Sequence, residues 1–95
     1  MSSKQDIKAI WAVILPYPIG TRVRYIKKLC TCRSCGITNY VGQEGTITRY
    51  LTLDERLNVK NNGTYPNLDL KETVYAVMLD NKGQFSFRHF ELEVL

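Results

Sequence analysis

The chain of 95 residues contains little of what membrane proteins and disulfide-bonded proteins need. No apolar run approaches the roughly 20 residues that cross a bilayer, so we expect no membrane association. Cysteine occurs only three times, and an odd number does not suit a disulfide framework. The apolar stretch 9–19 contains two prolines, has charged residues close before it and lacks a cleavage pattern. We therefore expect a cytoplasmic protein with reduced thiols.

Groups suited to catalysis are also scarce. His89 is the only histidine, and the chain has no glycine-rich phosphate loop. Glu91 and Glu93 fall on one face of a short predicted strand, where solvated glutamates are usual. A nucleophile pair of Cys35 and His89 is the catalytic alternative, but a chain of this size leaves little room for a substrate pocket. We expect a protein that is not an enzyme and has no catalytic residues.

Acidic residues are nearly absent from the first part of the chain. Residues 1–43 contain seven basic side chains and one acidic, whereas residues 44–95 contain six basic and eight acidic, which together give the net charge of +4. This asymmetry indicates either a solvated basic face or a face that attracts anions, such as nucleic acid or an acidic protein. Cations would contact phosphates and an exposed tyrosine could stack on a base. The candidate residues are Arg22, Arg24, Lys27, Lys28, Arg33, Arg49 and Tyr50.

The composition is that of one globular domain. Hydrophobic residues make up 44% of the chain, enough for a modest core. A serine cap at Ser3 and an apolar stripe at helical spacing predict a short N-terminal helix, which Pro16 ends. We divide the chain into a helix with an extended entry, residues 1–18, and a barrel, residues 19–95.

Alternating apolar residues and turn signals predict five strands after this helix. The first lies in 19–26, the second follows the glycines near residue 42, and a hairpin turns at Asn81-Lys82-Gly83. A short strand closes the chain. Two long loops, residues 27–40 and 53–72, interrupt the pattern, and no crossover helix is expected. The predicted fold is mainly β: a five-stranded antiparallel barrel with a short N-terminal helix and two long loops.

Four segments resemble the SH3-like small β-barrels: IGTRVRY, VGQEGTI, YAVMLDNKG and FELEVL. The shared features are a glycine entering a basic strand, a Gly-x-x-Gly-Thr turn, a hairpin strand ending in aspartate and a closing Glu-Leu-Glu segment. The resemblance covers residues 19–95. This superfamily includes KOW-type modules, the ferredoxin–thioredoxin reductase variable chain and the photosystem I subunit IV family. It implies a five-stranded SH3-like barrel that docks onto a larger assembly without catalysis.

All three cysteines fall within the stretch CTCRSCG of the first long loop. Cys32 and Cys35 have the spacing of half a zinc knuckle, Cys30 could supply a third thiolate, and His89 would be the fourth ligand. The alternatives are small loop residues without a metal, or a redox pair. One zinc ion is the only cofactor that the sequence suggests.

The predicted hairpin strand is apolar on both faces. If Tyr75, Val77 and Leu79 face the core, then Val74, Ala76 and Met78 face outward and need cover. The stripe of the N-terminal helix could supply that cover from within the chain. The alternative is a protein-partner surface, with Trp11 as an anchor. Its candidate residues are Trp11, Val74, Met78 and Tyr65.

These observations favour a non-catalytic docking or adaptor module that binds a protein partner and modulates a larger complex. Its working surface would be the two long loops, because extended loops on a rigid scaffold often carry recognition. The alternative function is a KOW-like RNA- or DNA-binding module that uses the basic and aromatic face.

Overall fold

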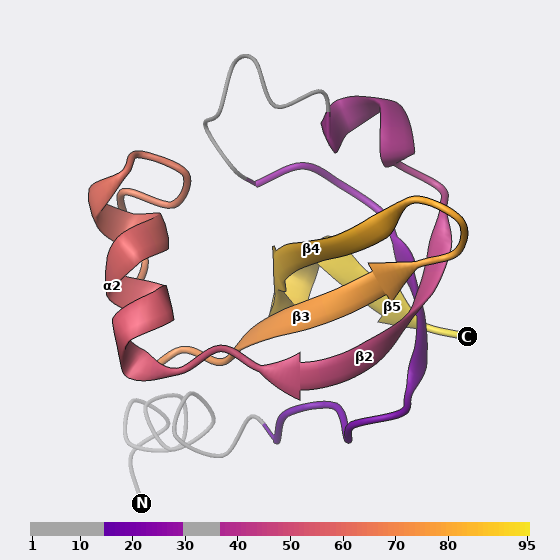
Figure 1. Ribbon diagram of the computed structural model, residues 1–95, viewed down its shortest axis with the longest axis horizontal. Coiled ribbons are helices and arrows are strands. Elements are labelled where there is room, and N and C mark those ends of the chain that lie inside the picture. The colour runs from indigo at the N-terminus through magenta and orange to yellow at the C-terminus, as the bar shows by residue number, and fades with distance from the viewer. Residues whose placement is uncertain (1–14, 30–36) are drawn as a thin grey trace, which may run out of the picture.

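In the part of the chain that the structure describes, the fold is a single antiparallel sheet with one α-helix beside it. The computed structural model describes residues 15–29 and 37–95 (Figure 1). The predicted N-terminal helix and the three cysteines lie outside these residues. The sheet has the strand order β4-β3-β2-β1-β5. Its strands are β1 (Arg22–Tyr25), β2 (Glu44–Tyr50), β3 (Val74–Leu79), β4 (Gly83–Arg88) and β5 (Leu92–Val94).

The mainly β architecture and the five antiparallel strands are confirmed, but the sheet is open where a closed barrel was expected. Among the described strands, no ladder joins β4 to β5. The chain leaves β4 through a short 3-10 helix, η2 (His89–Glu91), and β5 then pairs with β1 instead. Each of the two edge strands therefore has only one neighbour.

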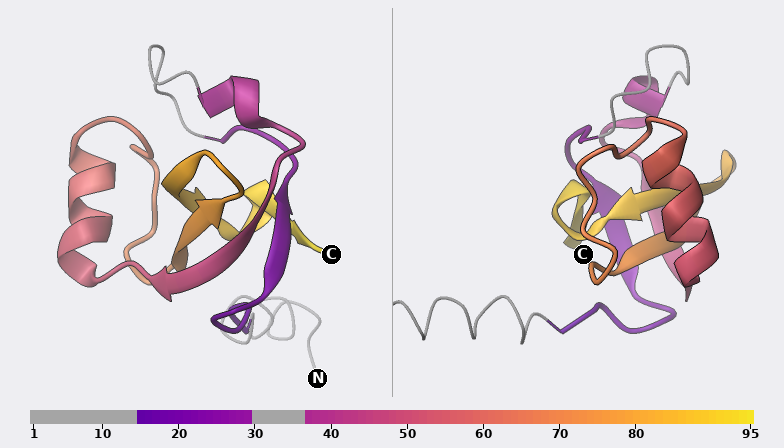
Figure 2. Two further views of the ribbon diagram at one scale, coloured as in Figure 1. Left: turned by 45° about the vertical axis from the view of Figure 1, so that its right-hand side comes forward. Right: turned by 90° about the vertical axis from the view of Figure 1, so that its left-hand side faces the viewer.

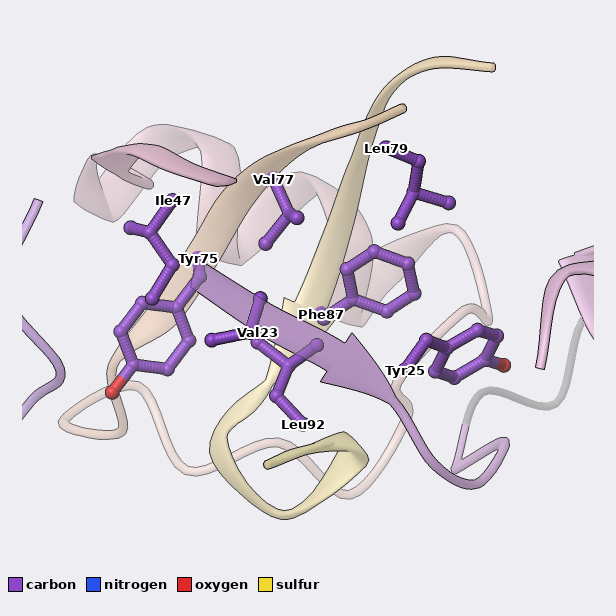
Figure 3. Packing of buried hydrophobic residues seen from close by; sticks show 8 residues of the cluster. All are labelled: Val23, Tyr25, Ile47, Tyr75, Val77, Leu79, Phe87 and Leu92. Carbon is purple, nitrogen blue, oxygen red and sulfur yellow. The ribbon is translucent and has the colours of Figure 1, made fainter. Parts of the chain in front are cut away.

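The open sheet is nevertheless strongly rolled. In a flat sheet, β4 and β1 would lie roughly 14 Å apart, because three strand spacings separate them. The rings of Tyr25 on β1 and Phe87 on β4 are 4.6 Å apart. Alternate residues of all five strands meet inside this roll and form the main core (Figure 3). These residues are Val23, Tyr25, Ile47, Tyr75, Val77, Leu79, Phe87 and Leu92.

Strand β2 is curved and pairs with β1 on one side and with β3 on the other (Figure 1). Its register against β3 shifts between Ile47 and Arg49, which marks a bulge, and bulges increase local twist. At Gly45 the backbone of β3 comes very close: a β-carbon there would lie 2.5 Å from the carbonyl oxygen of Met78. Only glycine fits this position without a shift of β3.

The hairpin between β3 and β4 turns where the sequence predicted. Leu79 pairs with Gly83, and the amide of Lys82 donates to the carbonyl of Leu79. Asn81 has φ of 61° and Gly83 has φ of 99°. Asparagine and glycine tolerate this left-handed region best, which explains their place in the turn.

The second predicted loop, residues 53–72, is wrong in its first half, because this part forms a helix. Helix α2 (Leu53–Asn61) packs beside the β3–β4 hairpin (Figures 1 and 2). It begins with a capping box, in which Thr52 accepts from the Glu55 amide and the Glu55 carboxylate accepts from the Thr52 amide. None of its side chains is buried. Of the first predicted loop, the described end forms the 3-10 helix η1 (Ile37–Tyr40).

The segment from the end of β2 to the start of β3 covers the outer face of β3. Its residues Leu51, Tyr65 and Leu68 form a second core cluster with Val74 and Ala76. The N-terminal stripe expected to cover this face lies outside the described residues. Val74 and Tyr65, two candidates for a partner surface, are buried here at 0% and 2% exposure.

Candidate functional site

The predicted basic face on β1 is neutralised by an ion-pair ladder, which runs across the sheet from Asp80 through Arg22, Glu44 and Arg24 to Glu93. The Arg22 guanidinium donates to both carboxylate oxygens of Asp80, at 2.9 and 2.6 Å. Arg24 donates to Glu93 at 3.0 Å and to Glu44 at 3.3 Å. Hydrogen bonding to Arg22 lowers the pKa of Asp80. Two of the candidate phosphate-binding arginines are therefore committed to carboxylates within the chain.

A third candidate, Arg49, is also paired. It donates to both carboxylate oxygens of Glu55 on α2, at 2.6 and 2.7 Å. This contact, with the Thr52 backbone bond, lowers the pKa of Glu55 to about 2. The same pattern recurs at Arg88, which donates to both oxygens of Glu72 at 2.6 and 2.7 Å. The connection from β2 to β3, residues 51–73, is called the α2 segment here. These bidentate pairs fix its two ends to the sheet.

The other members of the predicted basic set do not gather with these arginines into one free cationic face. Lys27 is exposed and Lys28 is half-buried, in the segment after β1. The Tyr50 hydroxyl donates to the backbone carbonyl of Tyr17 at 2.8 Å, so it serves the fold. Arg33 lies outside the described residues.

An aromatic cluster of Tyr17, Tyr50, Tyr75 and His89 holds the segment that enters β1. The Tyr17 amide donates to the Tyr75 hydroxyl at 2.9 Å, and the Tyr17 ring stacks on His89 at 4.3 Å. Burial raises the pKa of Tyr75 to about 12 and lowers the pKa of His89. The exposed Phe90 extends this cluster by an edge contact with His89. The cluster thus forms hydrogen bonds with both the amide and the carbonyl group of Tyr17.

His89 was predicted to be a zinc ligand, and in the structure it belongs to this aromatic cluster. Its Nδ1 lies 2.8 Å from the Tyr75 hydroxyl. Within residues 15–29 and 37–95, no three histidine, cysteine or acidic side chains form a group that could hold a metal ion. Cys30, Cys32 and Cys35, the other predicted zinc ligands, lie outside these residues.

Glu91 was expected to be solvated, but it is buried at 1% exposure. Its carboxylate accepts hydrogen bonds from the Tyr65 hydroxyl at 2.5 Å and from the amides of Arg88 and Leu29, both at 2.8 Å. Three donors from separate segments satisfy the charge, as a buried carboxylate requires. Glu91 therefore joins η2, the α2 segment and the start of the first long loop, which is a structural role.

A groove of about 320 Å³ lies between helix α2 and strand β4. Asp54 and Asn58 on its rim are exposed, so the groove opens to solvent on that side. Beyond it, Met78 is 43% exposed on the outer face of β3, the one member of the predicted partner surface whose side chain the structure shows at the surface. Trp11 lies outside the described residues. The groove is lined by Leu51, Asp54, Glu55, Asn58, Val59 and Ser86.

Sequence analysis missed this groove because it missed the helix. The signal was present in Thr52-Leu53-Asp54-Glu55, which matches the capping-box pattern. The pattern was overlooked because no apolar stripe follows it: α2 has polar or charged residues on most of its surface.

Comparisons with known proteins give no relative for this chain. No family model matches it, and neither the curated proteins nor the solved structures include a match. Among the described residues, no helix has the length and apolar character to span a membrane.

Proposed function

We propose that this chain is a non-catalytic docking module of the SH3-like barrel type, which binds a protein partner through helix α2 and the groove beside it. The observation that carries the proposal is the α2 segment itself: a helix with no buried side chain, fixed at its ends and leaving a groove over the sheet.

The rolled sheet supports the barrel part of this proposal. β1 and β5 pair, although they come from opposite ends of the described chain, and β4 reaches β1 across the core. Small barrels of this kind present loops from a rigid scaffold, and recognition residues are often found in such loops. The α2 segment is the longest connection between described strands, and it lies on the scaffold's outer face.

Ion pairing favours a protein partner over nucleic acid. Arg22, Arg24 and Arg49 would each have to give up a carboxylate partner before binding a phosphate. The alternative KOW-like function therefore depends on lysines such as Lys27, and on residues outside the described ranges.

The acid and base candidates support a role without catalysis. The Glu91 carboxylate is saturated by donors from the fold, and His89 is stacked on the Tyr17 ring and bonded to Tyr75. A general base needs access to the substrate proton that it removes.

Photo-crosslinking in the source cells tests the docking proposal. A benzoylphenylalanine replaces Asn61 of the full chain, which is exposed one turn after Asn58 on α2 and does not line the groove, or Val94 on β5 as an exposed control. We expect a protein adduct from position 61 and none from position 94, with its partner identified by mass spectrometry and recovered again by a reciprocal tag.

Two outcomes would overturn the proposal. One is an adduct that nuclease digestion removes, which would support the nucleic-acid alternative. The other is the same pattern of adducts at both positions, or none at either, which would show that the groove does not dock a protein.

A further inference from the structure

We infer that the groove beside α2 binds an arginine side chain of the partner protein. The inference rests on the docking function proposed above and specifies the chemistry that the groove selects. Three properties of the groove support it: the residues that line the groove, the charge that remains available there, and the volume of the groove.

The floor of the groove is apolar, whereas its rim is polar. Leu51 is buried and Val59 packs against the second core cluster, so together they form an aliphatic surface. Asp54 and Asn58 are one helical turn apart on α2 and therefore share a face of the helix. An occupant that fits both parts has an apolar stem and a polar head.

The available charge in the groove is that of Asp54. Both oxygens of the neighbouring Glu55 are already used by Arg49 and by the Thr52 amide. In the part of the chain that the structure describes, Asp54 has no ion-pair partner. The head of the occupant should therefore be a cation.

Arginine fits this combination better than lysine. Its guanidinium is planar and weakly hydrated, and its forked donors could bond the Asp54 carboxylate and the Asn58 amide oxygen together. Its aliphatic stem can lie along Leu51 and Val59. A volume of about 320 Å³ is at the lower end of ligand pockets, which suits one or two side chains of a peptide rather than a cofactor.

Titration of the full chain with small analogues tests the inference directly. The probe is n-butylguanidinium, followed through backbone amide shifts in NMR, with n-butylammonium and 1-pentanol as the lysine-like and neutral comparisons. We expect saturable shifts at Asp54, Asn58 and Ser86, and at least a threefold weaker affinity for the other two compounds.

The Asp54→Asn variant should weaken n-butylguanidinium binding about tenfold. The matched control is Asp69→Asn, which removes the same charge from an exposed position away from the groove lining and keeps an oxygen for the Lys71 amide. Equal binding by both variants, or no saturable shift in the parent chain, would overturn the inference.

Crosslinking separates this inference from the docking proposal. If the adduct from position 61 persists at full yield in the Asp54→Asn chain, the partner docks but does not use an arginine there. If the parent chain gives no adduct, the docking function itself is wrong.

Discussion

At the scale of single residues, Glu91 makes polar contacts with two segments that are distant from it in the sequence. Its side chain bonds Tyr65 and Leu29, and its backbone carbonyl accepts from the amide of Ile26. The Arg88 guanidinium lies over the Tyr65 ring at 5.7 Å, so a cation is close to the buried carboxylate. These contacts hold the β4–β5 turn against two otherwise separate segments.

We expect Glu91→Gln to destabilise the fold by about 1–3 kcal/mol, because one amide donor would face the Leu29 or Arg88 N–H group and leave it unsatisfied. Urea unfolding measures the change. Glu93→Gln is the control: it is exposed and paired with Arg24, so its loss should cost less than about 1 kcal/mol. A similar loss of stability in both variants would show that the Glu91 side chain does not hold the β4–β5 turn in place.

At the scale of elements, the strands were predicted and the helix was missed. Alternation placed Tyr75, Val77 and Leu79 on the core face, and glycine with asparagine predicted the hairpin turn. Helix α2 has a capping box but no apolar stripe, because tertiary contacts rather than an apolar face hold it. Glu91 was misplaced for a related reason: alternation in a short strand cannot show that a 3-10 turn and Tyr65 enclose a carboxylate.

Helix α2 should loosen in acid. The pKa of Glu55 is lowered in the fold from 4.5 to about 2, so its contribution to stability is present above pH 4.5 and is lost as the pH falls through about 2. Amide shifts of α2 measured by NMR from pH 6 to 2 should report this change.

The Arg49→Gln variant removes the main cause of the lowered Glu55 pKa and provides the control. In this variant the Glu55 carboxyl should titrate closer to its ordinary pKa, and α2 should loosen at a higher pH than in the parent chain. Identical titrations of the two proteins would contradict the role given to the Arg49–Glu55 pair.

At the scale of the whole molecule, the count of 13 basic side chains overstates the basic surface that is free to bind anions. Four arginines are used in internal ion pairs, which the charge asymmetry of the sequence could not show. Composition counts side chains but does not show which of them meet across a sheet. The candidate site changed for this reason from a basic face to a groove beside α2.

We expect weak binding to heparin with a shallow salt dependence. A slope of log K against log salt near −2 would correspond to about two or three ionic contacts. The Lys27→Gln variant should reduce this binding, whereas Arg22→Gln should not, because Arg22 is paired with Asp80. A slope of about −6 that Arg22→Gln lowers would restore the nucleic-acid alternative.

The pairing of β1 with β5 has a consequence for how the chain acquires its structure. Val23 is registered against Val94, and Tyr25 packs on Phe87, so contacts between distant parts of the chain complete the core. Closing such large loops is entropically costly, and domains dominated by these contacts usually fold in milliseconds to seconds. During synthesis β1 can pair with β2, but its other edge must wait for β5 until Val94 has left the ribosome.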